Sequence, residues 1–296
     1  MKWEGRRQSS NVEDRRGRGR GLSRGAKVGG GLGGMGIVAA VVMVLLGADP
    51  MQVISQLLGG GIGGTAGTPT TQTRNAPLDA EAERIGRFTS VVLADTETTW
   101  NRLFQRYGSR YQEPTLVLFE NQVRSACGSA SAATGPFYCP ADAKLYLDTS
   151  FFDQLARMGA PGDFAQAYVI GHEVAHQVQN LTGVLTKVRA LQGRVSQAQS
   201  NALQVLVELQ ADCYAGVWAH HAERSRDLLE SGDAEEGLRA AASIGDDTLQ
   251  RNAGRAVRPE SFTHGSSAQR VQWFRAGIRG GDVATCDTFA EAGVQL

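Results

Sequence analysis

The chain has 296 residues, of which 42% are hydrophobic, 20% are charged and 7% are aromatic. This composition is typical of a globular protein and excludes the disordered and fibrous classes. The formal net charge at pH 7 is zero, but nine basic residues face three acidic ones before residue 28, so the remainder is net acidic. A net acidic body is unlike the proteins that track nucleic acid, and we expect no nucleic-acid partner.

The first part of the chain predicts a membrane protein. Residues 28–48 carry no charge and are about long enough for one bilayer crossing. Basic residues in 1–27 should hold that arm in the cytoplasm, which puts everything after residue 49 on the periplasmic or extracellular side. We therefore expect a single-pass protein with a basic cytoplasmic arm and a transmembrane anchor. The alternatives are a buried core helix, because glycines dilute the hydrophobicity, and a cleaved signal peptide, for which the basic region is too long.

Residues 49–77 predict a flexible linker. From residue 59 onward this stretch is rich in Gly, Thr, Ala and Gln, with a single charge at Arg74. Such a composition cannot bury enough apolar surface to become ordered by itself. The folded domain should therefore begin near residue 78 and continue to residue 296, which is long enough for one sizeable core.

The domain at 78–296 is predicted to be an α+β fold, mainly helical with a small antiparallel sheet. Apolar residues recur at helical spacing from 78 to about 107, which indicates one long amphipathic helix. A short apolar strand follows at 115–119, and strands at 137–138 and 144–147 are joined by a turn at Pro140. Further helices are expected from Asp163, as the N-cap, to about Leu181, from about Ala198 to Arg224, and from near Ser266.

The four cysteines all lie after the predicted anchor, which agrees with an exported domain. They show none of the Cys-x-x-Cys spacing that is typical of zinc knuckles or redox sites. Four cysteines allow three pairings. Our hypothesis is two disulfides, a local one between Cys127 and Cys139 and a long-range one between Cys213 and Cys286.

The run His172-Glu173-Val-Ala-His176 is the strongest chemical signal in the sequence. Two histidines four residues apart on a helix project from one face, where both can reach the same metal ion. Glu173 is placed to accept a proton from a metal-bound water. The alternative is an ordinary pair of hydrogen-bonded helical histidines.

Two acidic residues on the later predicted helix complete a candidate zinc site. Two histidines leave a catalytic zinc one protein ligand short, and a carboxylate from another helix is a usual third. We assign Glu208 as that ligand. Asp212, four residues on, would accept the outer N–H of a liganding histidine, which we take to be His172. The alternative is that both acids form salt bridges on a solvated helix face.

This pattern of His172-Glu173-x-x-His176 followed by Glu208-x-x-x-Asp212 resembles the gluzincin metallopeptidases. More narrowly, four other motifs resemble the bacterial neutral zinc metallopeptidase family, and with them the likeness covers nearly the whole domain. They are Cys127-Gly-Ser-Ala-Ser, Gly135-Pro-Phe-Tyr-Cys-Pro140, Ser261-Phe-Thr-His-Gly265 and Cys286-Asp-Thr-Phe.

The resemblance implies a membrane-anchored, zinc-dependent endopeptidase acting on a protein or peptide substrate. Zn²⁺ held by the three ligands would activate a water molecule. Glu173 would take the proton of that water and later deliver it to the leaving amine. The natural substrate does not follow from the resemblance.

Two further assignments concern the reacting groups. A developing oxyanion needs a donor besides the metal, and His264 is the candidate, in a predicted loop close to Arg270. The alternatives are that His264 caps the following helix or lies on the surface. In the gluzincin arrangement an edge strand pairs with the substrate backbone, so Lys144, Leu145 and Tyr146 are the candidate substrate-binding residues. The alternative is an ordinary amphipathic hairpin.

Two other functions compete with peptide hydrolysis. The domain could be a zinc-binding envelope protein with a binding or regulatory role. The presence of Glu173 weighs against this, because a structural zinc site needs no base. A metal-dependent deaminase is disfavoured because the paired cysteine ligands of those sites are missing.

Overall fold

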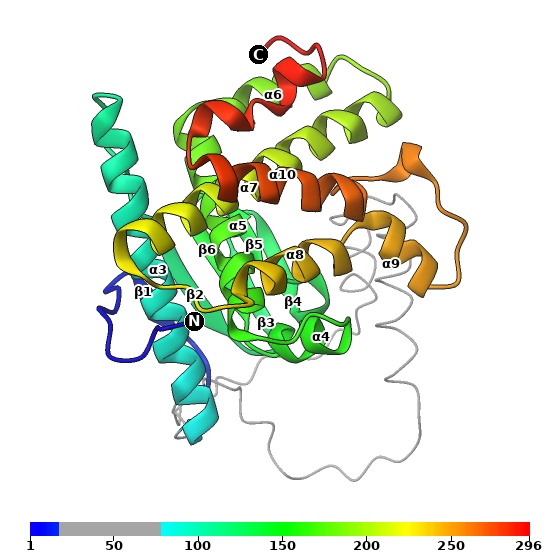
Figure 1. Cartoon of the computed structure of the whole chain (residues 1–296). Coiled ribbons are helices and arrows are strands. Elements are labelled where there is room, and N and C mark those ends of the chain that lie inside the picture. Colours follow the sequence, from blue (N-terminus) through cyan, green and yellow to red (C-terminus); the bar gives the residue numbers. More distant parts are fainter. Residues whose placement is uncertain (18–77) are drawn as a thin grey trace, which may run out of the picture.

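The computed structural model describes residues 1–17 and 78–296, which form a mainly helical α+β fold around a small sheet (Figure 1). This confirms the predicted mainly helical α+β class. No helix within these two ranges combines the length and apolar content that a membrane crossing requires. The predicted anchor at 28–48 and linker at 49–77 lie outside the described residues.

The main sheet has four strands in the order β1-β2-β6-β5. Strand β2 pairs in parallel with both β1 and β6, whereas β5 and β6 are antiparallel. The sheet is therefore mixed, and the prediction of an antiparallel sheet was wrong. The reason is that the sequence pattern located the strands but carried no information on which strands would be neighbours. The strands are β1 (Val12–Asp14), β2 (Thr115–Phe119), β5 (Phe137–Cys139) and β6 (Lys144–Asp148).

Both faces of the sheet are covered. Leu116 and Leu118 of β2 belong to the main core with the helices, while Val117 and Phe119 pack on the other face with a small hairpin. The hairpin consists of β3 (Gln122–Ser125) and β4 (Gly128–Ser131), for which the sequence analysis predicted no strand. Its Cys127 is bonded to Cys139 of β5, which confirms the predicted local disulfide.

Three long helices build the body of the fold, and all three were predicted. They are α3 (Ala80–Arg106), α5 (Asp163–Leu181) and α7 (Gln197–Arg226). The N-cap of α5 is Gly162 and not Asp163, because Gly162 adopts a φ of 122° that suits glycine. The shorter helices are α4 (Phe151–Arg157), α6 (Val184–Gln192), α8 (Asp233–Ser243), α9 (Asp246–Asn252), α10 (Ser267–Gly280) and α11 (Thr288–Glu291).

Helix α10 lies directly against α7, backbone to backbone. A Cβ atom added to Gly277 of α10 would stand 2.0 Å from the carbonyl oxygen of Cys213, and one added to Gly216 of α7 would stand 2.3 Å from that of Phe274. The disulfide between Cys213 and Cys286 holds the segment after α10 to the same face of α7, which confirms the second predicted pair. This close packing carries the side chains of α10 into the centre of the fold.

The first 17 residues are part of this fold, although the sequence analysis assigned them to a separate cytoplasmic arm. They lie along α3 and include strand β1 at the edge of the sheet (Figure 1). Arg7 is paired with Glu97 of α3, and Arg16 is paired with Asp14 within the segment itself. The charge count indicated a separate basic arm because the acidic partner of Arg7 is remote in sequence.

We predict that Gly277→Ala destabilises the protein because the added methyl group has no space between α10 and α7. The expected loss in the free energy of unfolding is about 2–3 kcal/mol. Chemical unfolding with both disulfides intact measures it. Gly193→Ala, at a position with a φ of −68° where the nearest atom to an added Cβ lies 3.8 Å away, should change stability by less than about 1 kcal/mol. Equal losses in the two variants would contradict the packing argument.

Candidate metal centre

The two histidines of the predicted motif lie side by side on α5. His172 and His176 are one helical turn apart, and their ring centroids are separated by 4.9 Å. The helix can approach α7 at this point because residue 171 is glycine. A Cβ atom there would stand 2.8 Å from the ring of Trp218 on α7. The small residue therefore allows the histidine face of α5 to meet α7.

Glu208 of α7 faces both imidazoles, as the sequence predicted. Its Oε2 atom is 3.1 Å from Nε2 of His172 and 3.6 Å from Nε2 of His176. One potential ligand atom from each residue falls within 4.8 Å of the others. Burial acts to raise the pKa of Glu208, but the neighbouring imidazoles outweigh it and hold that pKa well below its usual range. A buried carboxylate between two nitrogens is a ready-made site for a cation.

Asp212 fixes the ring of His172. Its Oδ1 atom lies 2.9 Å from Nδ1 of His172, so the ring donates there and turns Nε2 towards Glu208. Burial acts to lower the pKa of His172, but the hydrogen bonds to Asp212 and Glu208 raise it to about 10. The predicted partnership of Asp212 with His172 is therefore present in the structure.

Arg270 of α10 balances the charge of Asp212. Its Nε and Nη2 atoms donate to the two carboxylate oxygens at 2.8 and 2.9 Å, and Asp212 is fully buried. Burial acts to raise the pKa of Asp212, and the guanidinium overcomes this to bring it down to about 2. Tyr168 of α5 also donates its hydroxyl to Asp212. The network depends on α10, whose close contact with α7 brings Arg270 to this position.

Gln179 plays the corresponding part for His176, and sequence analysis missed it. Its amide Nε2 donates to the carbonyl oxygen of Val207 at 2.8 Å, which fixes the orientation of the amide. The amide oxygen then accepts from Nδ1 of His176 at 2.8 Å, so Nε2 of that ring is left facing Glu208. Gln179 is fully buried, and a helical glutamine three residues after a histidine gives no sequence signal of this role.

His264 lies in a loop that packs against α7 close to Glu208. A Cβ atom added to Gly265 would be 3.2 Å from Leu209 and from Val205, the two apolar neighbours of that region of α7. The side chain of His264 is 52% exposed. The loop position keeps it near the candidate ligands, as predicted, and leaves it accessible from solvent.

Asp246, the first residue of α9, organises this loop and was also missed. Its Oδ2 atom accepts from the backbone N–H groups of Thr263, His264 and Gly265, at 2.7, 2.6 and 3.1 Å. Its Oδ1 atom is 3.3 Å from Nδ1 of His264. Partial burial acts to lower the pKa of His264, but the bond to Asp246 raises it overall. Eighteen residues separate the pair, so only the folded loop brings it together.

Glu173 follows His172 on α5 and is half-buried. Within residues 1–17 and 78–296, its carboxylate has no hydrogen bond or ion pair. Its position in the turn between the two histidines places it beside the candidate ligands, as the motif predicted.

The strand chosen as the substrate-binding edge is not an edge. Strand β6 lies between β2 and β5, and Leu145 and Tyr146 are 1% and 2% exposed. The amine of Lys144 is paired with Glu13 of β1. The backbone of β6 is used on both sides, so these three residues cannot pair with a substrate strand. Among the described residues the edge strands of this sheet are β1 and β5, and the Tyr138 hydroxyl of β5 contacts Gln177 and Asn180 of α5.

Comparison with known proteins identifies relatives of this chain and its family. The chain is 44% identical to the uncharacterized protein YpfJ of Escherichia coli (strain K12), over 99% of this chain and all of that protein. It is 40% identical to the uncharacterized protein Rv2575 of Mycobacterium tuberculosis (strain H37Rv), over 84% of this chain and 85% of that protein. No solved structure matches it. Residues 1–289 match the family described as "Putative neutral zinc metallopeptidase", and the chain belongs to this family.

Proposed function

We propose that the protein is a zinc-dependent endopeptidase. The observation that carries the proposal is the meeting of two imidazole Nε2 atoms at one buried carboxylate oxygen of Glu208. In each imidazole the other nitrogen is occupied, by Asp212 in one case and by Gln179 in the other. Two oriented histidines and one carboxylate match the ligands of catalytic zinc sites in peptidases.

The candidate ligands fit Zn²⁺ in their number, in their chemistry and in the side chains that hold the histidine rings in place. A bound zinc ion would supply Lewis acidity and lower the pKa of a coordinated water to about 7. The side chains that hold the histidine rings are themselves buried and hydrogen-bonded, which limits their rotation. Three protein ligands leave a further position for a water or a substrate carbonyl.

The remaining residues of the site have distinct proposed roles. Glu173, whose carboxylate is not engaged by the described residues, takes a proton from the attacking water and returns it to the leaving amine. His264, oriented by Asp246, donates a hydrogen bond to the oxyanion that forms from the substrate carbonyl. The edge strand β5, next to α5, replaces β6 as the strand that pairs with the substrate backbone.

We further propose that the catalytic domain works in an oxidising compartment. Both disulfides are formed in the structure, and such bonds persist outside the cytoplasm. Membrane attachment through residues 28–48 stays a prediction from the sequence. A zinc-binding protein without hydrolytic activity is the alternative function, and the presence of Glu173 beside the histidines favours the enzyme over it, because a structural zinc site needs no base.

We predict that Gln179→Met lowers the affinity for zinc by about 10- to 100-fold, because the ring of His176 loses the acceptor that orients it. Competition with a chromophoric chelator measures the affinity, and circular dichroism checks the fold. Gln197→Met, at an exposed position at the start of α7, is the matched control and should bind zinc like the original chain. Unchanged affinity in a folded Gln179→Met protein would remove the orienting role.

Glu173→Gln should retain one zinc ion per chain and lose peptide cleavage by a factor of about 100 or more, because the amide cannot accept a proton. Metal analysis and fluorogenic peptide hydrolysis measure the two quantities. Glu235→Gln, on the exposed face of α8, is the control and should cleave at the original rate. Cleavage by Glu173→Gln at an undiminished rate assigns the base to another residue.

For His264→Ala we expect kcat to fall by about 100-fold or more with a much smaller change in KM, because the bond to the oxyanion forms only in the transition state. Steady-state kinetics on the zinc-loaded protein gives both constants. His220→Ala serves as the control, since His220 bonds to the carbonyl oxygen of Ile278 on α10. A turnover number that survives His264→Ala excludes the oxyanion role.

A further inference from the structure

We infer that residues 1–17, here named the N-terminal strap, occupy the same cellular compartment as residues 78–296. The strap packs against those residues there as an integral part of the domain. This inference is independent of the proposed hydrolysis, because it rests on packing alone. Three separate parts of the domain receive the strap.

Glu97 of α3 is the first of these. Its side chain is 2% exposed, and its carboxylate accepts hydrogen bonds from Arg7, Ser9 and Asn11 of the strap. No other described residue donates to this carboxylate. Glu97 therefore has its hydrogen-bonding requirement met only while the strap is in place.

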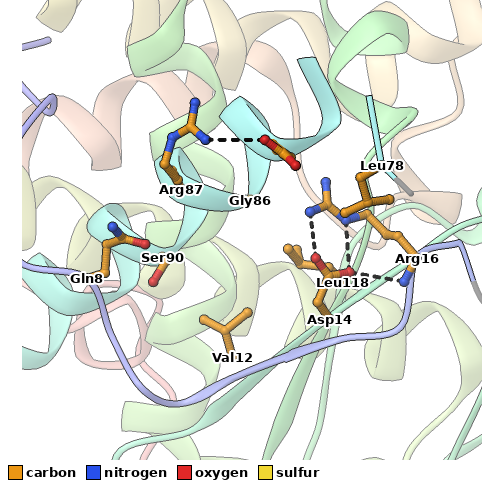
Figure 2. A pocket seen from close by; sticks show the side chains of 10 residues that line it. Gln8, Val12, Asp14, Arg16, Leu78, Gly86, Arg87, Ser90 and Leu118 are labelled. Carbon is orange, nitrogen blue, oxygen red and sulfur yellow. Dashed lines mark hydrogen bonds and ion pairs between the residues drawn. The ribbon is translucent and has the colours of Figure 1, made fainter. Parts of the chain in front are cut away.

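Gly86 of α3 is the second. A Cβ atom at this position would lie 2.5 Å from the guanidinium of Arg16, so the absence of a side chain makes room for the arginine. The Arg16 side chain is 1% exposed, pairs with Asp14 and donates to the carbonyl oxygen of Ala82 at 2.6 Å. A cavity of about 320 Å³ lies between the strap and α3. Figure 2 shows Arg16, Asp14 and Gly86 among the residues that line it. Glycine in a helix interior lowers stability, so its presence at position 86 indicates a binding position specific to the Arg16 side chain.

The sheet and the core form the third. Strand β1 pairs in parallel with β2 from Val12 to Asp14. Trp3 is 8% exposed and contacts Phe88 edge-on, with ring centroids 5.4 Å apart. The family match also begins at residue 1 and so includes the strap. The strap thus contributes a strand and an aromatic side chain to the main fold.

The docked strap has a consequence for the predicted topology. A single membrane crossing between residues 17 and 78 would place β1 and β2 on opposite sides of the bilayer. The pairing of these strands is incompatible with that orientation. We therefore infer that the strap lies on the same side of the membrane as the domain, instead of in the cytoplasm with the domain exported.

A cysteine pair in the full-length chain tests docking inside cells. Ser9 and Ser90 are joined by two hydrogen bonds of 3.0 Å, one between backbone groups and one from the Ser90 hydroxyl to the Ser9 carbonyl. Serine to cysteine changes little in size, Arg7 and Asn11 still donate to Glu97 when the Ser9 hydroxyl is lost, and the four native cysteines are already paired. After treatment of cells with a membrane-permeable oxidant, Ser9→Cys/Ser90→Cys should form an intrachain cross-link in most molecules. Peptide mass spectrometry identifies the bond.

Ser9→Cys/Ser109→Cys is the matched control, because Ser109 lies beyond the far end of α3, roughly 25 Å from Ser90. It should cross-link at least tenfold less. In parallel, single variants Gln8→Cys and Ser109→Cys, both exposed, are probed in spheroplasts with a membrane-impermeant maleimide. Both should be labelled alike. A missing Ser9–Ser90 cross-link, one that joins two chains, or labelling of the two single variants from opposite sides of the membrane overturns the inference.

Discussion

The buried carboxylate of Glu208 between two imidazoles is the interaction on which the rest of the structure depends. A carboxylate taken out of water is costly unless cations or donors surround it. The fold meets this requirement with the facing nitrogens of α5. Those rings are in turn held by Asp212 and Gln179. The burial of the Glu208 carboxylate therefore depends on the two histidines and also on the residues that orient them.

Backbone contact between helices makes this arrangement possible. Glycines at positions 171, 216 and 277 allow α5 to approach α7 and α7 to approach α10. Arg270 then reaches Asp212 from a helix more than fifty residues later in the chain. The site is assembled from three helices whose separations are set by the smallest side chain, so the chemistry and the packing cannot be altered independently.

The sequence revealed the parts of the site that repeat at helical spacing. His172 with His176 and Glu208 with Asp212 are each four residues apart, and this spacing alone places each pair on one face. Gln179 escaped notice because an amide on a helix has many ordinary uses. Asp246 was missed because its partnership with His264 exists only after a loop folds back over eighteen residues. These two roles depend on orientation and on tertiary contact, which periodicity does not describe.

The strands and the strap show the same limit at the level of the fold. Short apolar runs located β2, β5 and β6 correctly, but edge or central position depends on pairing partners. Strand β6 therefore looked available to a substrate when it is enclosed on both sides. The strap was assigned to a separate basic arm because Glu97, the partner of Arg7, lies far from it in the sequence. In the structure it completes the sheet edge beside β2.

Peptide cleavage under control of the metal tests the central claim most directly. The purified full-length protein, stripped with a chelator and then titrated with Zn²⁺, is incubated with a diverse peptide library and the products are identified by mass spectrometry. The account predicts no cleavage by the stripped protein and full activity at one zinc ion per chain. Cleavage that persists without metal, or a zinc-loaded protein that cuts no peptide, would contradict it.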